Sequence, residues 1–63
     1  MAYKIKEIRE KKKLSQAELA KMSGVSRATI IRLESEADVE TTIGTLQSLA
    51  AALEVSVEAL FLP

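Results

Sequence analysis

Cysteine and histidine are absent from the 63-residue sequence, and tyrosine occurs only once. Without thiols the chain can form neither a disulfide nor a thiolate metal site, and a reducing cytoplasm is its simplest compartment. No nucleophile can be paired with a base, so we expect neither an enzyme nor a bound cofactor. Three spaced carboxylates, Glu36, Asp38 and Glu40, could hold a hard cation. An acidic loop of this kind rarely does so, and we expect no metal site.

Aromatic residues are scarce, at 3% of the chain, although 48% of it is hydrophobic. The core must therefore consist of aliphatic side chains, which suit a small bundle of helices. No alternating apolar pattern indicates a strand, and no apolar run approaches the length of a membrane span. The sequence also begins without an apolar signal segment. We expect one all-α domain over residues 1–63, marginally stable because of its size, with no membrane partner.

Basic residues are missing from the second half of the sequence, so the charges are separated although the net charge is zero. All nine Lys and Arg residues lie between Lys4 and Arg32, where three glutamates oppose them and leave +6. From Leu33 onward, six acidic residues and no basic ones give −6. Such an asymmetry indicates an interaction surface on the basic half; the alternative is a solvated face that happens to be basic.

Residues 15–34 are typical of two short helices joined by a turn at Gly24. Ser15 can cap the first helix, and Glu18, three residues later, completes a capping box. A glycine at the end of a helix adopts the left-handed backbone of a turn at the least cost. Ser26 can then cap the second helix. The pattern predicts a helix-turn-helix, in which the second helix enters the major groove of DNA.

The second helix of this motif has one buried and one exposed face. Ile30 and Leu33 repeat at helical spacing and should be buried, whereas Arg27 and Arg32 point away from them. Ala20 is small at the point where the two helices should cross. Because the basic residues coincide with the motif, the charge asymmetry favours a DNA-binding surface.

Five helices are expected in all. They lie at about 4–12, 16–22 and 27–34, then after Thr41 or Thr42, and finally after Ser56. The first should turn Ile5 and Ile8 inward, and its last turn carries three lysines, Lys11 to Lys13, which either complement the helix dipole or contact phosphate. The fourth carries a buried stripe of Ile43, Leu46, Leu49, Ala50 and Leu53. The last carries Val57, Leu60 and Phe61.

Several segments match a known family in register: Ile8-Arg9-Glu10, Leu14 to Ala20, Gly24-Val25-Ser26, Ile30, Leu33-Glu34, Thr45-Leu46 and Leu49 to Ser56. Together they resemble the Cro/repressor family of helix-turn-helix proteins, which includes phage repressors, small bacterial regulators and some antitoxins. The resemblance covers nearly the whole chain, from about Lys4 to Phe61. It implies a sequence-specific regulator that binds double-stranded DNA.

The resemblance also implies roles for single residues. Gln16 matches the family residue that bonds phosphate and braces the recognition helix. Arg9 and Glu34 match a pair that ties the first helix to the end of the third. The positions that face DNA in the family are occupied by Ser26, Arg27, Ala28 and Arg32, and Thr29 among them could contact phosphate.

The side chains of the recognition helix suggest how it would read DNA. Arg27 is the best candidate for a bidentate contact to guanine, and Ala28 could lie against a thymine methyl group. Arg32 could reach either a base or only a phosphate. Ile31 should be partly exposed; it could touch DNA or a partner, but a lone exposed isoleucine is ordinary and we favour that interpretation.

The loop after the third helix departs from the family pattern. The family usually has glycine with basic residues or Asn-Pro there, whereas this chain has Glu36, Asp38 and Glu40. Carboxylates repel phosphates, so either the loop is held away from DNA or binding is weaker than usual. Glu-Ala-Asp-Val followed by Thr45-Leu46 is similar to loops in antitoxin members of the family, which keeps a toxin protein open as a partner.

The favoured function is therefore that of a repressor which binds a palindromic operator as a homodimer, because one small motif buries too little surface for tight binding. The apolar C-terminal segment could form the dimer surface, through Val55, Val57, Phe61 and Leu62. Its alternative role is simply to complete the core. The alternative function is that of an antitoxin, which binds a toxin and regulates its own operon.

Overall fold

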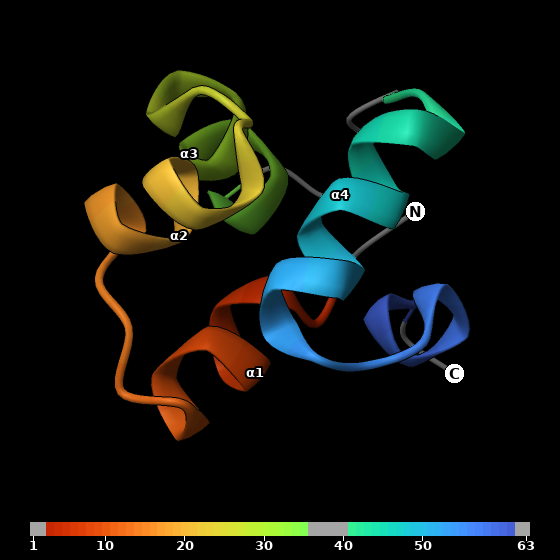
Figure 1. Cartoon of the computed structure of the whole chain (residues 1–63), viewed down its shortest axis with the longest axis horizontal. Helices are drawn as coiled ribbons and strands as arrows, with labels where there is room; N and C mark the ends of the chain where they lie inside the picture. Colours follow the sequence, from red (N-terminus) through yellow and green to blue (C-terminus); the bar gives the residue numbers. More distant parts are fainter. Residues whose placement is uncertain (1–2, 36–40, 62–63) are drawn as a thin grey trace.

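The computed structural model describes residues 3–35 and 41–61. Its elements in chain order are α1 (Ile5–Lys11), α2 (Gln16–Ser23), α3 (Arg27–Ser35), α4 (Ile43–Leu53) and the 3-10 helix η1 (Val57–Leu60) (Figure 1). The all-α class expected from the sequence is confirmed. The acidic loop at Glu36, Asp38 and Glu40 lies outside the described residues, as does Leu62.

The fifth expected helix is not an α-helix. Ser56 caps it, as expected, but the Val57–Leu60 segment forms only a single 3-10 turn. The backbone becomes extended at Phe61, which pairs with Tyr3 in an isolated antiparallel bridge. Leu60 O accepts a hydrogen bond from Lys4 N–H at 2.7 Å, so this carbonyl is satisfied by the start of the chain and not by a longer helix.

The helix ends follow the predicted capping residues. Ser15 Oγ accepts a hydrogen bond from Glu18 N–H at 3.0 Å, and Ser15 N–H donates to Glu18 Oε1 at 2.9 Å, which completes the capping box. Gly24 ends α2 with a left-handed φ of +75°. Thr42 caps α4, which decides between the two candidate threonines. Local chemistry thus places the boundaries of α2 and α4.

The core is aliphatic, as the composition predicts. Its buried members come from every element and are Ile5, Leu19, Ile30, Leu33, Leu46, Leu49, Ala50, Leu53 and Leu60. Ile8 is half-buried at its edge. One expected member was wrong: Ile43 is 61% exposed. It is the first residue of α4, one turn before Leu46, so it lies past the end of the core although it continues the spacing of the buried stripe.

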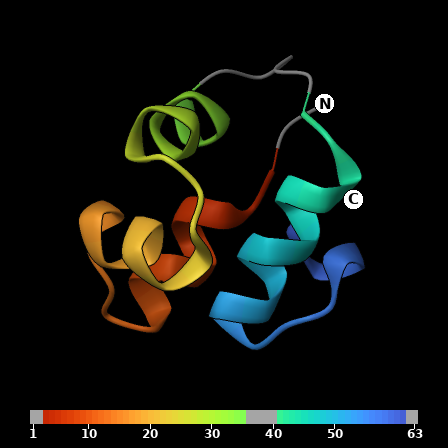
Figure 2. The ribbon, with the colours of Figure 1, turned by 45° about the horizontal axis from the view of Figure 1, so that its top comes forward.

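The helices pack around this core in a definite order. α2 packs against both α3 and α4, while α1 packs against α3 and η1 packs against α4. Figures 1 and 2 show α3 at one edge of the bundle and η1 on the side away from it. One face of α3 is therefore free of the other elements of the described chain.

Candidate nucleic-acid interface

The turn between α2 and α3 is fixed by local hydrogen bonds. Gly24 N–H donates to Ala20 O at 2.9 Å. Ser23 Oγ donates to Leu19 O at 2.7 Å and accepts from Val25 N–H at 3.2 Å. A Cβ on Gly24 would meet no atom within 4 Å, so glycine is favoured there by the positive φ and not by a lack of space. These contacts set the direction in which α3 leaves α2.

The α3 helix has a buried face and an exposed face. Ile30 and Leu33 anchor it, with 0% and 1% of their surface exposed. The exposed side chains of the described residues of α3 include Arg27, Ala28, Ile31 and Arg32. Ala28, Ile31 and Arg32 follow Arg27 by one, four and five residues. At these spacings all four side chains lie on one side of the helix. A short helix with two arginines on its free side can enter a major groove.

The C-terminal end of α3 is tied to α1 and α2 through Glu34. Arg9 donates from Nε to Glu34 Oε2 at 2.8 Å and from Nη2 to Oε1 at 3.1 Å. Gln16 Nε2 donates to the same Oε1 at 3.0 Å, and Arg9 Nη1 donates to Leu14 O at 2.7 Å. The Glu34 side chain is only 3% exposed. Three helices therefore meet at one buried carboxylate, and Arg9 also links it to the loop before α2.

This network holds its charges in fixed positions. The hydrogen bond to Glu34 raises the pKa of Arg9, against the opposing effect of burial, so its guanidinium stays protonated. Gln16 uses one amide N–H on Glu34 and has a second, because a primary amide carries two donors. Sequence reasoning placed Gln16 as a brace for the recognition helix but did not find its acceptor. The two residues are 18 positions apart, and no local pattern links them.

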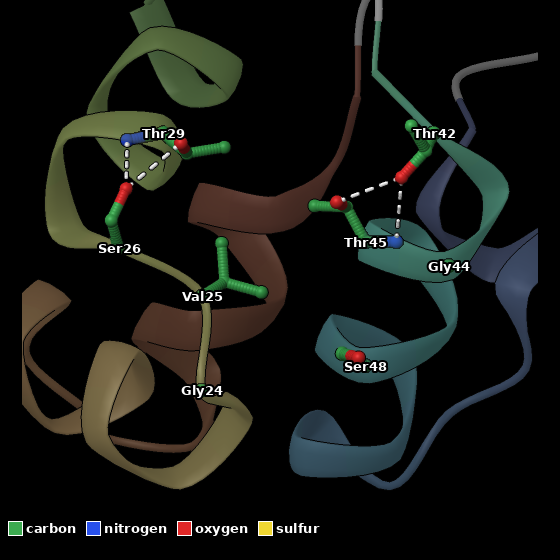
Figure 3. A pocket seen from close by; sticks show the side chains of 8 residues that line it. All are labelled: Gly24, Val25, Ser26, Thr29, Thr42, Gly44, Thr45 and Ser48. Carbon is green, nitrogen blue, oxygen red and sulfur yellow. Dashed lines mark hydrogen bonds between the residues drawn. The ribbon is translucent and has the colours of Figure 1, made fainter.

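A pocket of about 560 Å³ separates the start of α3 from the start of α4 (Figure 3). Its lining residues are Gly24, Val25, Ser26, Thr29, Thr42, Gly44, Thr45 and Ser48. Ser26 Oγ accepts from Thr29 N–H at 3.2 Å and donates to Thr29 Oγ1 at 2.9 Å. On the opposite side of the pocket, Thr42 and Thr45 make the same kind of paired contact with each other. The lining is thus uncharged, and two of its hydroxyls, those of Ser26 and Thr42, cap helices.

Comparison with known proteins decides the class of this motif. A family model for helix-turn-helix proteins of the Cro/C1 type matches residues 5–60. The chain belongs to this helix-turn-helix family.

Two solved structures are similar to this helix-turn-helix protein. The restriction-modification controller protein C.AhdI from Aeromonas hydrophila shares 31% identity at a TM-score of 0.83, over 92% of this chain and 86% of that one. A chain in the complex of the SinR and SinI proteins shares 33% identity at a TM-score of 0.81. That match covers 87% of this chain but only 53% of the other. No curated protein matches the chain. These similarities support DNA-binding transcriptional regulation.

The predicted dimer residues that the structure describes, Val55, Val57 and Phe61, lie within or beside η1. Val55, Val57 and Phe61 are half-buried and pack against the core of their own chain. The ring of Phe61 also lies 5.6 Å from that of Tyr3, measured between centroids. Sequence reasoning assigned Phe61 to a dimer surface or to the core, and it did not foresee the contact with Tyr3. Part of each of these side chains remains available to a second subunit.

Within residues 3–35 and 41–61, no group of three or more acidic, histidine or cysteine side chains could hold a metal ion. The three carboxylates considered for a cation are not among these residues. No helix of the described segments is long and apolar enough to cross a membrane.

Proposed function

We propose that the protein is a sequence-specific regulator that binds double-stranded DNA with α3 in the major groove and represses transcription from a palindromic operator as a homodimer. The observation that supports this most strongly is the free side of α3. Exposed arginines lie there, directly opposite side chains with no more than 1% of their surface exposed. Ile30 and Leu33 pack the helix against the core, and its two arginines face outward.

Arg27 is the proposed base-reading residue. It is the first residue of α3, and the N-terminal residues of a recognition helix are those that contact base edges. Its guanidinium can donate two parallel hydrogen bonds to O6 and N7 of guanine. Arg32 lies more than one turn further along and contacts a base or a phosphate.

The α2 and α3 termini supply the proposed phosphate contacts. Gln16 offers its second amide N–H, and the bond to Glu34 holds the amide in place. Ser26 and Thr29 stand at the start of α3, where a helix also attracts anions through its dipole. Contacts of this kind fix the register of α3 without reading sequence.

A second subunit is needed because a single small motif buries too little surface for a tight specific complex. Two copies with α3 helices about 34 Å apart would read successive major grooves on one face of the duplex. The half-buried C-terminal segment at Val55, Val57 and Phe61, together with Leu62, is the proposed contact between them.

Selection of bound sequences from a random DNA pool tests this function. We expect a palindromic site with half-sites one helical turn apart, and sedimentation should give two chains per duplex. Arg27→Ala should weaken binding to the selected site by about 1–3 kcal/mol and relax the preference for one guanine. Arg32→Ala should change the sequence preference less.

Lys21→Ala is the matched control, because it removes an exposed cation from the last turn of α2 and not from α3. Its effect should be small and equal for all sequences. If Arg27→Ala weakened every sequence equally, Arg27 would contact a phosphate and another residue would read the base. Selection of no sequence at all would contradict the proposed function as a whole.

A role as an antitoxin is the second candidate. One similar structure is a chain from a complex of two proteins, SinR and SinI, so a chain that contains this fold can assemble with a protein partner. The acidic second half of the chain would suit a basic toxin. A toxin-like reading frame beside the gene, whose product copurifies with this chain and is inhibited by it, would favour this role. It is compatible with DNA binding by the basic half.

A further inference from the structure

Ile31 is an apolar side chain on an otherwise polar and small-residue surface. Among the described residues, the exposed large hydrophobic side chains are Met22 on α2, Ile31 on α3 and Ile43 on α4, with 56%, 41% and 61% exposed. Of these, only Ile31 belongs to the proposed recognition helix. It therefore differs from an exposed isoleucine placed at random on the surface.

Its neighbours on the helix place Ile31 in the middle of the free side of α3. Arg27 precedes it by four residues and Ala28 by three, and residues at these spacings are neighbours on a helix surface. Arg32 follows directly. Ile31 and Ala28 thus form one small apolar area between two exposed arginines.

Nothing in the described structure covers this area. Ser35, the next residue on the same side, folds back and donates its hydroxyl to Ile31 O at 2.6 Å. That bond engages the side chain of Ser35 with the helix backbone. Within residues 3–35 and 41–61, neither Arg27 nor Arg32 is held by an ion pair, so both are free to engage an anion or a base on either side of Ile31.

We propose that Ile31 is a specificity-determining residue that reads, together with Ala28, the methyl group of a thymine in the major groove. This rests on the proposed function. The C5-methyl group is the one apolar feature that a base pair presents in that groove, so an apolar side chain selects A·T over G·C by contact with it. Arg27 and Ile31 are separated by about 6 Å along the helix axis, which corresponds to about two base pairs. The thymine should therefore lie within about two base pairs of the guanine read by Arg27.

Replacement of thymine by deoxyuridine tests the contact, because it removes the methyl group and leaves base pairing unchanged. The selected site is prepared with each thymine replaced in turn, and binding of the wild-type chain and of Ile31→Ala is measured. We expect one replacement to weaken wild-type binding about three- to fivefold, as the loss of one buried methyl group predicts. Ile31→Ala should lose about the same factor on the thymine site and should respond less than the wild type to that replacement, because only Ala28 still contacts the methyl group.

Ile43→Ala is the matched control, since it makes the same truncation at a more exposed isoleucine outside α3. It should keep the wild-type response to each replacement. The proposal is overturned if Ile31→Ala binds as tightly as the wild type, or if it keeps the same sensitivity to deoxyuridine. A chain that selects a site and loses affinity on Arg27→Ala, but shows either of those results, would retain the proposed function and lose only this contact. A wild-type chain that selects no site would contradict both.

Discussion

Arg9 and Glu34 illustrate how one buried ion pair can organise the site. Two hydrogen bonds of 2.8 and 3.1 Å join them, and Glu34 also accepts from Gln16. The pair itself touches neither α3's exposed face nor a groove. It acts by fixing the end of α3 against α1 and by holding one N–H of Gln16, which leaves the other for the proposed phosphate contact.

Removal of one partner from this pair should be costly, because the other charge is left buried without a partner. We expect Arg9→Ala to lower the free energy of unfolding by about 3 kcal/mol, a large part of the total for a domain of this size. The double replacement of Arg9 by Met and Glu34 by Leu should cost less than Arg9→Ala alone. Urea titrations of both variants measure this, with Lys6→Ala on the exposed side of α1 as the control. A double variant that is less stable than Arg9→Ala would show that the loss does not come from a buried charge left without its partner.

At the scale of the element, α2 is defined by its two ends. Ser15 and Glu18 exchange hydrogen bonds at its start, and Gly24 ends it with a left-handed backbone. Because α3 follows directly after the turn, the ends of α2 also set the position of the recognition helix. The stability of α2 therefore depends on its capping interactions more than the stability of α4 does, because α4 buries four side chains.

The capping box of α2 should be sensitive to acid. The backbone hydrogen bond from Ser15 lowers the pKa of Glu18, so the charged form is favoured in the folded state. This stabilisation is complete above the pKa of a free glutamate, about 4.3, and is lost as the pH falls through the lower folded value. Thermal unfolding at pH 7 should show Glu18→Gln to be less stable than the wild type, and the difference should shrink toward pH 3.

Ser15→Ala provides the comparison for this effect. It should cost about 1 kcal/mol at neutral pH, because one N–H of the first turn loses its acceptor. It should nevertheless keep most of the acid sensitivity, since the Ser15 backbone N–H still donates to Glu18. An acid sensitivity that persisted in Glu18→Gln would have to come from other carboxylates.

The elements that sequence reasoning located correctly are those fixed by local chemistry. Ser15, Gly24 and Thr42 each act on residues within one helical turn, and Ile30 and Leu33 follow the helical period. The errors arose where distant parts of the chain meet. The short η1 is followed at once by the pairing of Phe61 with Tyr3, and the exposure of Ile43 depends on where the core ends.

Two further features were also beyond local reasoning. Lys13 and Glu54 both have a left-handed φ of 59°. Neither is a glycine, the residue from which such a backbone is usually predicted. The acceptor for Gln16 is contributed by a helix that begins eleven residues later, at Arg27. Family resemblance suggested a bracing role for Gln16 because it carries information on three-dimensional neighbours that the periodicity of one sequence does not contain.

At the scale of the whole molecule, the charges are arranged in two parts. The segment from Lys4 to Arg32 carries a net +6, and the segment from Leu33 onward carries −6. Glu54 and Glu58 belong to the end of the bundle near η1, which lies away from α3 in both views (Figures 1 and 2). Glu36, Asp38 and Glu40 instead follow the recognition helix directly in the sequence. These two acidic groups should affect DNA binding differently.

The affinity for DNA should fall steeply with salt, with a slope of about −0.9 for each phosphate that the basic segment neutralises. Conversion of Glu36, Asp38 and Glu40 to their amides should raise the affinity, because we expect carboxylates that follow the recognition helix directly in the sequence to repel phosphates. The gain should be larger at low salt, since screening at high salt shortens the reach of the charges. Sequence preference should weaken at the same time, because every duplex offers the same phosphates.

Amide replacement at Glu54 and Glu58 serves as the control and should change the affinity less per charge removed. An unchanged affinity of the triple variant at low salt would mean that the acidic segment does not approach DNA, and it would favour a protein partner for that segment.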